Sequence, residues 1–169
     1  MAQNNNYLIK LDFWLIDNVF QPIADRLPGE RTSINLGLNL ILGSVVFSLA
    51  FLILPLILYN SGLFASTYNI LSCILAFCFY GYVYQTQSLI KERYVNPLRY
   101  HLFGIRIISL PFAFYGLYVH FIGTYFVNKI SLFYSISNVL SLCGLYMISC
   151  NLNPPLQKQK QAAFSRSSL

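Results

Sequence analysis

The sequence contains no charged residue from Thr32 through Ile90. A helix that crosses the hydrocarbon core of a bilayer needs about 20 apolar residues, so this stretch can hold two crossings joined by a turn. Two further uncharged stretches cover Ile107–Asn128 and Ile130–Gln157. Charged residues make up 9% of the chain, against about 25% in a soluble domain, and hydrophobic residues make up 56%. We therefore expect an integral membrane protein, which excludes most soluble enzyme folds and nucleic-acid-binding modules.

Four membrane-spanning helices fit these uncharged stretches. A turn-rich cluster at Tyr59–Gly62 divides the first stretch, and Asn128 with Lys129 separates the last two spans. The predicted fold is therefore an all-α integral membrane protein, with four transmembrane helices arranged as two tandem hairpins. The predicted transmembrane domain covers residues 35–150, with spans at 35–58, 68–84, 107–126 and 130–150, a basic loop at 85–106 and a tail at 151–169.

The basic residues lie almost entirely on one side of this predicted topology. Of the 11 Lys and Arg residues, only Lys129 falls in a loop on the far side. Loops rich in Lys and Arg stay in the cytoplasm. We therefore expect both termini and the loop at 85–106 to be cytoplasmic in a bacterial inner membrane, or on the matrix side of an organellar inner membrane. Topology also accounts for the net charge of +6, and no nucleic acid is expected as a partner.

The segment before the first span, residues 1–34, is predicted to lie on the cytoplasmic side. Within it, Tyr7–Phe20 is too short and too charged to cross a bilayer, yet is strongly apolar. We predict an amphipathic helix in the membrane interface, with Trp14 at the level of the lipid headgroups. The pattern is imperfect, because Asp12 points away from the polar face. Packing of this helix on the cytoplasmic end of the bundle, or on a partner subunit, is the alternative.

Two short motifs repeat in the same order along the chain. Pro22–Arg31 and Pro97–Arg106 both read P-[IL]-x3-L-x-G-x-R, and each precedes a predicted hairpin. Ser66–Ser72 and Ser135–Ser141 both read S-x2-N-[IV]-L-S. The order suggests tandem duplication of a helical hairpin, and chance similarity in a biased composition is the alternative. In each copy, Pro and Gly would let the chain turn from the membrane surface into the bilayer.

Few polar residues lie inside the predicted spans. Asn35 and Asn39 are one turn apart on the first span, and Ser137, Ser141 and Gly144 form a stripe of small residues on the fourth. Such stripes let helices approach closely and form hydrogen bonds across the contact. Helix packing is therefore the predicted role of these five residues, and a pore lining is the alternative.

Two other kinds of residue are candidates for function. His120 is an imidazole within a predicted span, where it could hydrogen-bond a neighbouring helix or act as a proton relay or ligand. Basic and aromatic residues at the cytoplasmic edge could contact anionic lipid headgroups or the acidic surface of a partner. The residues predicted to make these lipid or partner contacts are Trp14, Arg31, Arg93, Arg99 and Arg106.

The sequence shows no catalytic motif. It has no H-E-x-x-H, no G-x-S-x-G and no Walker loop, and its four cysteines lack the spacing of a metal or redox site. We expect no enzymatic activity, no cofactor and no metal site. The leading hypothesis is a non-catalytic accessory or assembly subunit of a larger membrane complex, in contact with lipids and with other subunits or further copies of itself. A stand-alone binding protein, such as an immunity protein against a pore-forming toxin, and a small channel or carrier are the alternatives.

Overall fold

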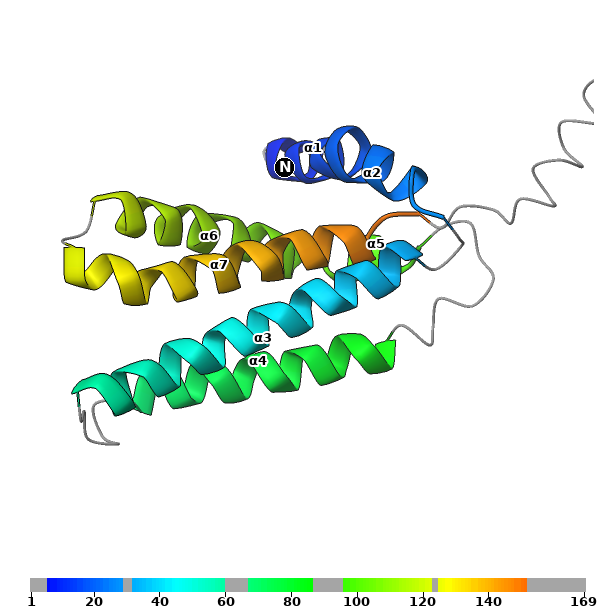
Figure 1. The fold of residues 1–169 in the computed structure, drawn as a ribbon. Coiled ribbons are helices and arrows are strands. Elements are labelled where there is room, and N and C mark those ends of the chain that lie inside the picture. The colour runs from blue at the N-terminus through cyan, green and yellow to red at the C-terminus, as the bar shows by residue number, and fades with distance from the viewer. Residues whose placement is uncertain (1–5, 29–31, 60–66, 87–95, 123–124, 152–169) are drawn as a thin grey trace, which may run out of the picture.

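A computed structural model of the protein describes residues 6–28, 32–59, 67–86, 96–122 and 125–151 (Figure 1). These residues are almost entirely helical and include no strand, so the predicted all-α fold is confirmed. The helices are α1 (Asn6–Leu15), the π-helical turn η1 (Ile16–Phe20), α2 (Gln21–Asp25), α3 (Thr32–Tyr59), α4 (Thr67–Thr86), α5 (Leu98–His101), α6 (Phe103–Ile122) and α7 (Tyr125–Ile148).

Two helices in the described part of the chain are long and apolar enough to span a membrane. These are Thr32–Leu54 within α3 and Phe103–Ile122, which is the whole of α6. The apolar segments of α4 and α7, Ile70–Thr86 and Leu132–Ile148, are shorter. Length and hydropathy therefore support two crossings, at the predicted first and third spans.

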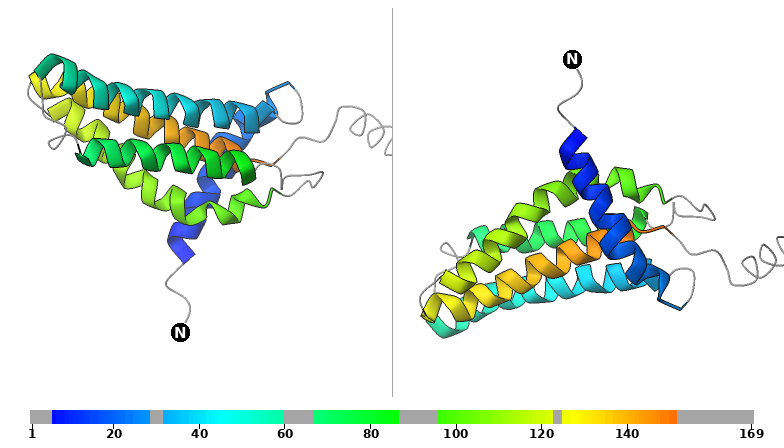
Figure 2. Two further views of the ribbon diagram at one scale, coloured as in Figure 1. Left: turned by 90° about the horizontal axis from the view of Figure 1, so that it is seen from below. Right: turned by 90° about the horizontal axis from the view of Figure 1, so that it is seen from above.

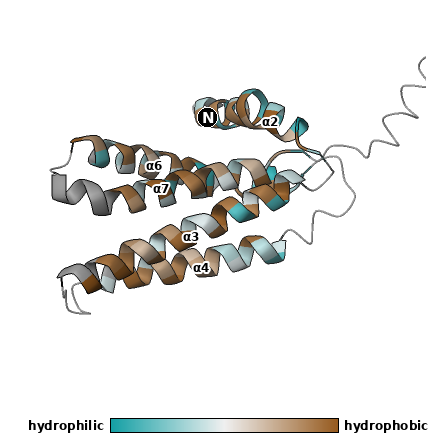
Figure 3. Cartoon of the chain, viewed as in Figure 1, coloured by the Kyte–Doolittle hydropathy of each residue, from teal (hydrophilic) through white to brown (hydrophobic). Residues whose placement is uncertain are grey.

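The four long helices form two hairpins, α3 with α4 and α6 with α7, which meet through α3 and α7 (Figure 1). The contact between α3 and α7 is the most extensive in the fold, whereas α4 packs mainly on α3 and α6 packs mainly on α7. Apolar residues cover most of these helices (Figure 3). Large apolar side chains are exposed on α4 and α6, among them Leu71, Ile74, Phe77, Ile108, Phe114 and Phe121.

The crossing of α3 and α7 is close because each helix contributes a glycine. A Cβ atom on Gly37 would lie 2.5 Å from Cγ1 of Ile148 and 2.8 Å from the carbonyl oxygen of Gly144. A Cβ atom on Gly144 would lie 2.7 Å from the carbonyl oxygen of Gly37 and 2.7 Å from Cγ1 of Ile41. No larger residue fits between the two backbones, and the absence of side chains here allows the helices to approach.

Apolar side chains close the bundle at the end where α3 and α6 begin and α4 and α7 end. Leu98 of α5 and Leu102, which follows it, are buried against α3, α4 and α7. The short helix α5 therefore joins the two hairpins at this end of the molecule. The buried residues of this cluster are Ile34, Leu38, Ile41, Val83, Leu98, Leu102, Leu145 and Ile148.

The helices α1, η1 and α2 run across α6 and α7 near the same end (Figure 2). Residues eight apart on an α-helix differ in direction by about 80°. The wider π-helical turn reduces this difference, so Ile16 and Ala24 both face the bundle. They pack with Tyr146, Met147 and Cys150 at the end of α7 in a second buried cluster. The predicted alternative of a helix packed on the bundle therefore describes the inner face of this segment.

Candidate functional site

A buried ion pair lies where α1 crosses the start of α6. Asp12 and Arg106 are both fully buried. The Arg106 guanidinium donates from Nε to Oδ1 of Asp12 at 2.9 Å and from Nη2 to Oδ2 at 2.5 Å. It also donates from Nη1 to Oγ of Ser149 at 2.6 Å and from Nη2 to the carbonyl oxygen of Arg99 at 2.7 Å. All three guanidinium nitrogens are thus bonded within the protein, as a buried charge requires.

A stacked pair of aromatic rings lies beside this ion pair. The Arg106 guanidinium carbon lies 5.5 Å from the centre of the Tyr146 ring, within the range of a cation–π attraction. Phe20 of η1 stacks on the Tyr146 ring, with 4.8 Å between the ring centres. The ion pair and these rings fix the N-terminal helices to α6 and α7. We refer to Asp12, Arg106, Ser149 and Tyr146 as the ion-pair cluster.

A second ion pair joins the same segments nearer the surface. Nη2 of Arg99 lies 2.5 Å from Oδ1 of Asp17, and the two side chains are 12% and 52% exposed. The Arg99 guanidinium carbon lies 4.8 Å from the centre of the Phe13 ring. An exposed pair of this kind contributes at most about 1 kcal/mol. It supplements the contact that the ion-pair cluster makes.

Asn96 connects the end of α7 with the start of α5. Its side chain is fully buried and donates from Nδ2 to the carbonyl oxygens of Ile148, at 2.5 Å, and Cys150, at 2.8 Å. Its Oδ1 accepts a hydrogen bond from the backbone N–H of Leu98 at 2.9 Å. One side chain thus satisfies backbone groups at two helix ends. The sequence analysis missed Asn96, although an Asn-Pro dipeptide is a turn signal.

The structure places the predicted lipid and partner contacts in different environments. Trp14 is 55% exposed and is available for such a contact. Arg106 is not, because its side chain is buried in the ion-pair cluster, and this corrects the prediction made for it. The Arg99 guanidinium forms an ion pair with Asp17 and lies over the Phe13 ring, and the side chain is only 12% exposed. Arg31 and Arg93 lie outside the described residues.

The predicted packing residues also separate into two groups. Gly144 lies at the helix crossing, and Ser137 is buried between α7 and α3. Asn35 and Asn39 are exposed on α3 and do not face the other described helices of this chain, so their predicted helix packing stays a prediction. The face of α3 that packs on α7 instead contains Gly37, which the sequence analysis did not single out. Gly37 faces the opposite way because it is about 160° around the helix from both asparagines.

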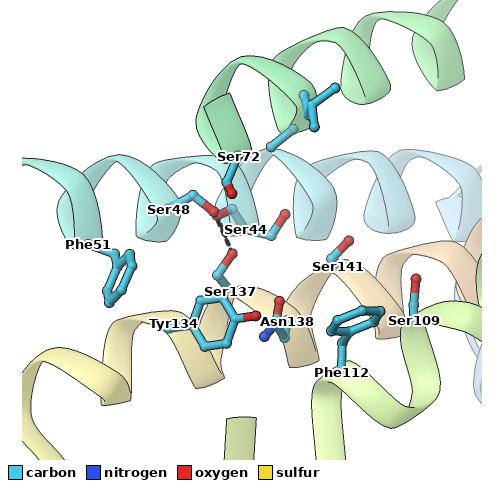
Figure 4. Close-up of a pocket in the computed structure, with 12 residues that line it drawn as sticks. Ser44, Ser48, Phe51, Ser72, Ser109, Phe112, Tyr134, Ser137, Asn138 and Ser141 are labelled. Atoms are coloured by element: carbon cyan, nitrogen blue, oxygen red, sulfur yellow. Dashed lines mark hydrogen bonds between the residues drawn. The ribbon is translucent and has the colours of Figure 1, made fainter. Parts of the chain in front are cut away.

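A cavity of about 460 Å³ lies between the four long helices (Figure 4). Ser137 donates to the carbonyl oxygen of Ser44 at 2.8 Å, and its Oγ lies 2.7 Å from Oγ of Ser48. A hydroxyl has one proton, so Ser48 is the donor in the second bond. Of the lining residues, Ser137 and Ser141 had been predicted as packing residues, and Ser72, Asn138 and Ser141 belong to the repeated motif. The serines that line the cavity are Ser44, Ser48, Ser72, Ser109, Ser137 and Ser141.

His120 lies near the end of α6 and does not line this cavity. It is half-buried, and its ring centre lies 5.6 Å from that of Phe121. Within the described residues, no group of three or more His, Cys, Asp or Glu side chains is placed to hold a metal ion. Comparison with protein-family models, curated proteins and solved structures finds no match to this chain.

Proposed function

We propose that this chain is a four-span membrane protein and a non-catalytic accessory or assembly subunit of a larger membrane complex. In this proposal α3, α4, α6 and α7 all cross the bilayer, and both termini lie on the cytoplasmic or matrix side. The helix lengths support it: α4 has 20 residues and α7 has 24. At 1.5 Å per residue these helices measure about 30 Å and 36 Å, comparable to a hydrocarbon core.

The exposed face of α3 is the observation that carries the subunit role. Asn35, Asn39, Leu42, Val46 and Ile53 recur at helical spacing on this face, and all are exposed. Asn39 lies about 10 Å along the helix from its first residue. A carboxamide that faces acyl chains at this depth leaves its hydrogen bonds unsatisfied, and a polar group on a neighbouring helix stabilises it. A transmembrane helix of another subunit is therefore the proposed occupant of this face.

The N-terminal helices support a second contact in the same assembly. Tyr7, Leu8, Leu11 and Trp14 form an exposed, largely apolar face on α1, while Asp12 faces the bundle. The ion-pair cluster holds α1 across the helix axes at the basic end of the molecule (Figure 2). A helix that lies across the axes of the long helices, with an exposed apolar face, is suited to the boundary between the lipid headgroups and the acyl chains. We propose that it lies there, on the same side as the termini.

Native extraction in mild detergent tests the subunit role. Sizing and mass spectrometry of the wild-type chain should reveal a large assembly with partners in fixed proportion. The double variant Asn35→Leu/Asn39→Leu should reduce co-migration at least about tenfold, since two interhelical hydrogen bonds are each expected to contribute about 0.6–2 kcal/mol. Tyr118→Leu, on an exposed face of α6, is the matched control and should retain the partners. A wild-type protein that runs as a monodisperse monomer, with nothing co-migrating, would overturn the proposal.

The alternatives make different predictions. An immunity protein predicts a toxin gene beside this one and a cell that becomes sensitive when this gene is deleted. A channel or carrier predicts solute flux in proteoliposomes that changes in His120→Ala or Asn39→Ala. Neither His120 nor Asn39 lines the cavity. The subunit role therefore remains the proposal that the described surface supports best.

A further inference from the structure

The cavity between the four long helices presents polar groups that the protein leaves without partners. Ser72, Ser109, Ser141 and Tyr134 form no hydrogen bond from their hydroxyl groups within the described part of the chain. The Nδ2 atom of Asn138 also has no partner there, but it is buried close to Gly116 of α6 and does not face the cavity. In Figure 4 the hydroxyl groups come from α4, α6 and α7 and surround one space. Hydroxyl groups that line a cavity and have no partner within the protein can bond a molecule there, so this arrangement points to a ligand that completes the bonds.

The lining determines the charge and size of such a ligand. Among the described residues that line the cavity there is no Asp, Glu, Lys, Arg or His. An ion would lose its hydration without gaining a counter-charge, so the ligand is uncharged. The cavity volume of about 460 Å³ lies within the range of small-molecule sites.

The packing of the helices determines how the ligand enters. The helices α3 and α7 form the back of the cavity, while α4 and α6 form its sides and share no extensive contact in the described residues. Phe51, Leu75 and Phe112 supply apolar walls beside the hydroxyl groups. A molecule that dissolves in the bilayer could pass between α4 and α6 and place its polar end against the serines.

We propose that this cavity binds a neutral, membrane-soluble molecule whose head carries a hydroxyl or carbonyl oxygen. Prenyl alcohols and alkylated quinones share this chemistry, because each combines a short polar head with an apolar tail. The serine hydroxyl groups can bond either kind of head, since a serine both donates and accepts a hydrogen bond. The proposal requires the four-helix arrangement but does not depend on a partner subunit.

The test uses the full-length protein in nanodiscs of phosphatidylcholine, with farnesol, decylubiquinone and glycerol as separate probes. Binding is measured by native mass spectrometry over a range of probe concentrations. We expect one farnesol or one decylubiquinone per chain, with saturation. Ser141→Ala and Tyr134→Phe should each weaken binding about fivefold to tenfold, the effect of one lost hydrogen bond. Ser109→Leu and Ser72→Leu, which narrow the cavity from opposite sides, should abolish it.

Ser33→Ala is the matched control, because Ser33 is a buried serine of α3 that does not line the cavity, and it should bind as the wild type does. Helix content and elution volume show that each variant is folded, and two narrowing variants on different helices keep the test valid if one fails to fold. Binding of farnesol alone or decylubiquinone alone identifies the head and supports the proposal. Saturable binding of glycerol alone would show a water-soluble ligand and overturn entry from the bilayer. Absence of binding by all three probes, or binding by both narrowed variants as tight as that of the wild type, would overturn the site itself.

Discussion

Asp12 and Arg106 lie 94 residues apart in the sequence and form a fully buried ion pair held by two hydrogen bonds. This contact fixes the first helix of the chain to the start of α6. It also explains the irregular pattern of α1, because Asp12, the acidic residue that lies away from the polar face, is the one that faces the bundle. Arg106, which had been predicted to contact lipid or a partner, thus has a role in folding.

Removal of one partner of this pair should destabilise the protein strongly. In Asp12→Ala, Arg106 keeps its buried charge but loses its counter-ion, and we expect a loss of about 3–5 kcal/mol in the free energy of unfolding. Unfolding in a detergent mixture, followed by circular dichroism, measures this loss. Limited proteolysis in native detergent should in parallel cleave at Lys10 or Arg26 faster than in the wild type.

A double variant separates the effect of the charge from that of the contact. Asp12→Leu/Arg106→Met replaces the ion pair with apolar side chains, and such replacements are often neutral or stabilising. We expect its free energy of unfolding to recover to within about 1–2 kcal/mol of the wild type. If the double variant were as unstable as Asp12→Ala, burial of an unpaired charge would not be the cause.

The crossing of α3 and α7 should not tolerate a methyl group. Gly144→Ala would place Cβ 2.7 Å from the carbonyl oxygen of Gly37, so the helices must separate, at a cost of about 1–3 kcal/mol. Gly81→Ala is the control, since nothing lies within 4 Å of its added Cβ. That change should be neutral or stabilise α4 by up to about 1 kcal/mol. Equal effects of the two substitutions on unfolding would contradict the close crossing.

The loss of Asn96 should weaken the junction of α5 and α7. Asn96→Ala leaves the carbonyl oxygens of Ile148 and Cys150 without their donor, and we expect a loss of about 1–3 kcal/mol. Asn18→Ala is the matched control, because Asn18 makes one exposed bond to the carbonyl oxygen of Trp14. Its effect on the free energy of unfolding should stay within about 0.5 kcal/mol. A loss in Asn96→Ala no larger than that of the control would show that its hydrogen bonds contribute little.

The single tryptophan reports where α1 lies. If its exposed face lies in the membrane interface, Trp14 fluorescence should shift to the blue in lipid vesicles and be quenched by lipids brominated near the headgroup. Bromines near the end of the acyl chains should quench it less. Emission typical of water-exposed indole, without quenching by either lipid, would place α1 away from the membrane.

The sequence was sufficient to predict the all-helical class and the two helices that are long and apolar enough to cross a membrane. The length of the uncharged stretches predicts these helices, because a segment that crosses a bilayer must satisfy its backbone hydrogen bonds within its own helix. The sequence also identified Ser137 and Gly144 on α7, since small residues at helical spacing on one face are visible without a structure.

Contacts between distant segments were beyond this kind of reasoning. Arg106 fitted the pattern of a basic residue at a membrane edge, and nothing local distinguishes that role from pairing with Asp12. Gly37 was missed because the partner that requires a glycine there, Gly144, belongs to the other hairpin. The cavity likewise combines serines from four helices, and no local pattern shows that they line the same space.

The most direct test of the proposed four-span protein is labelling of single cysteines with a membrane-impermeant maleimide. In a cysteine-free background, Ser61→Cys lies between α3 and α4 in sequence, Ser88→Cys follows α4, and Ser165→Cys lies in the tail. The four-span topology predicts that Ser61→Cys is labelled from the outer side of the intact membrane, whereas Ser88→Cys and Ser165→Cys are labelled only after permeabilisation. Labelling of Ser61→Cys and Ser88→Cys from the same side would show that α4 does not cross, and would contradict the account.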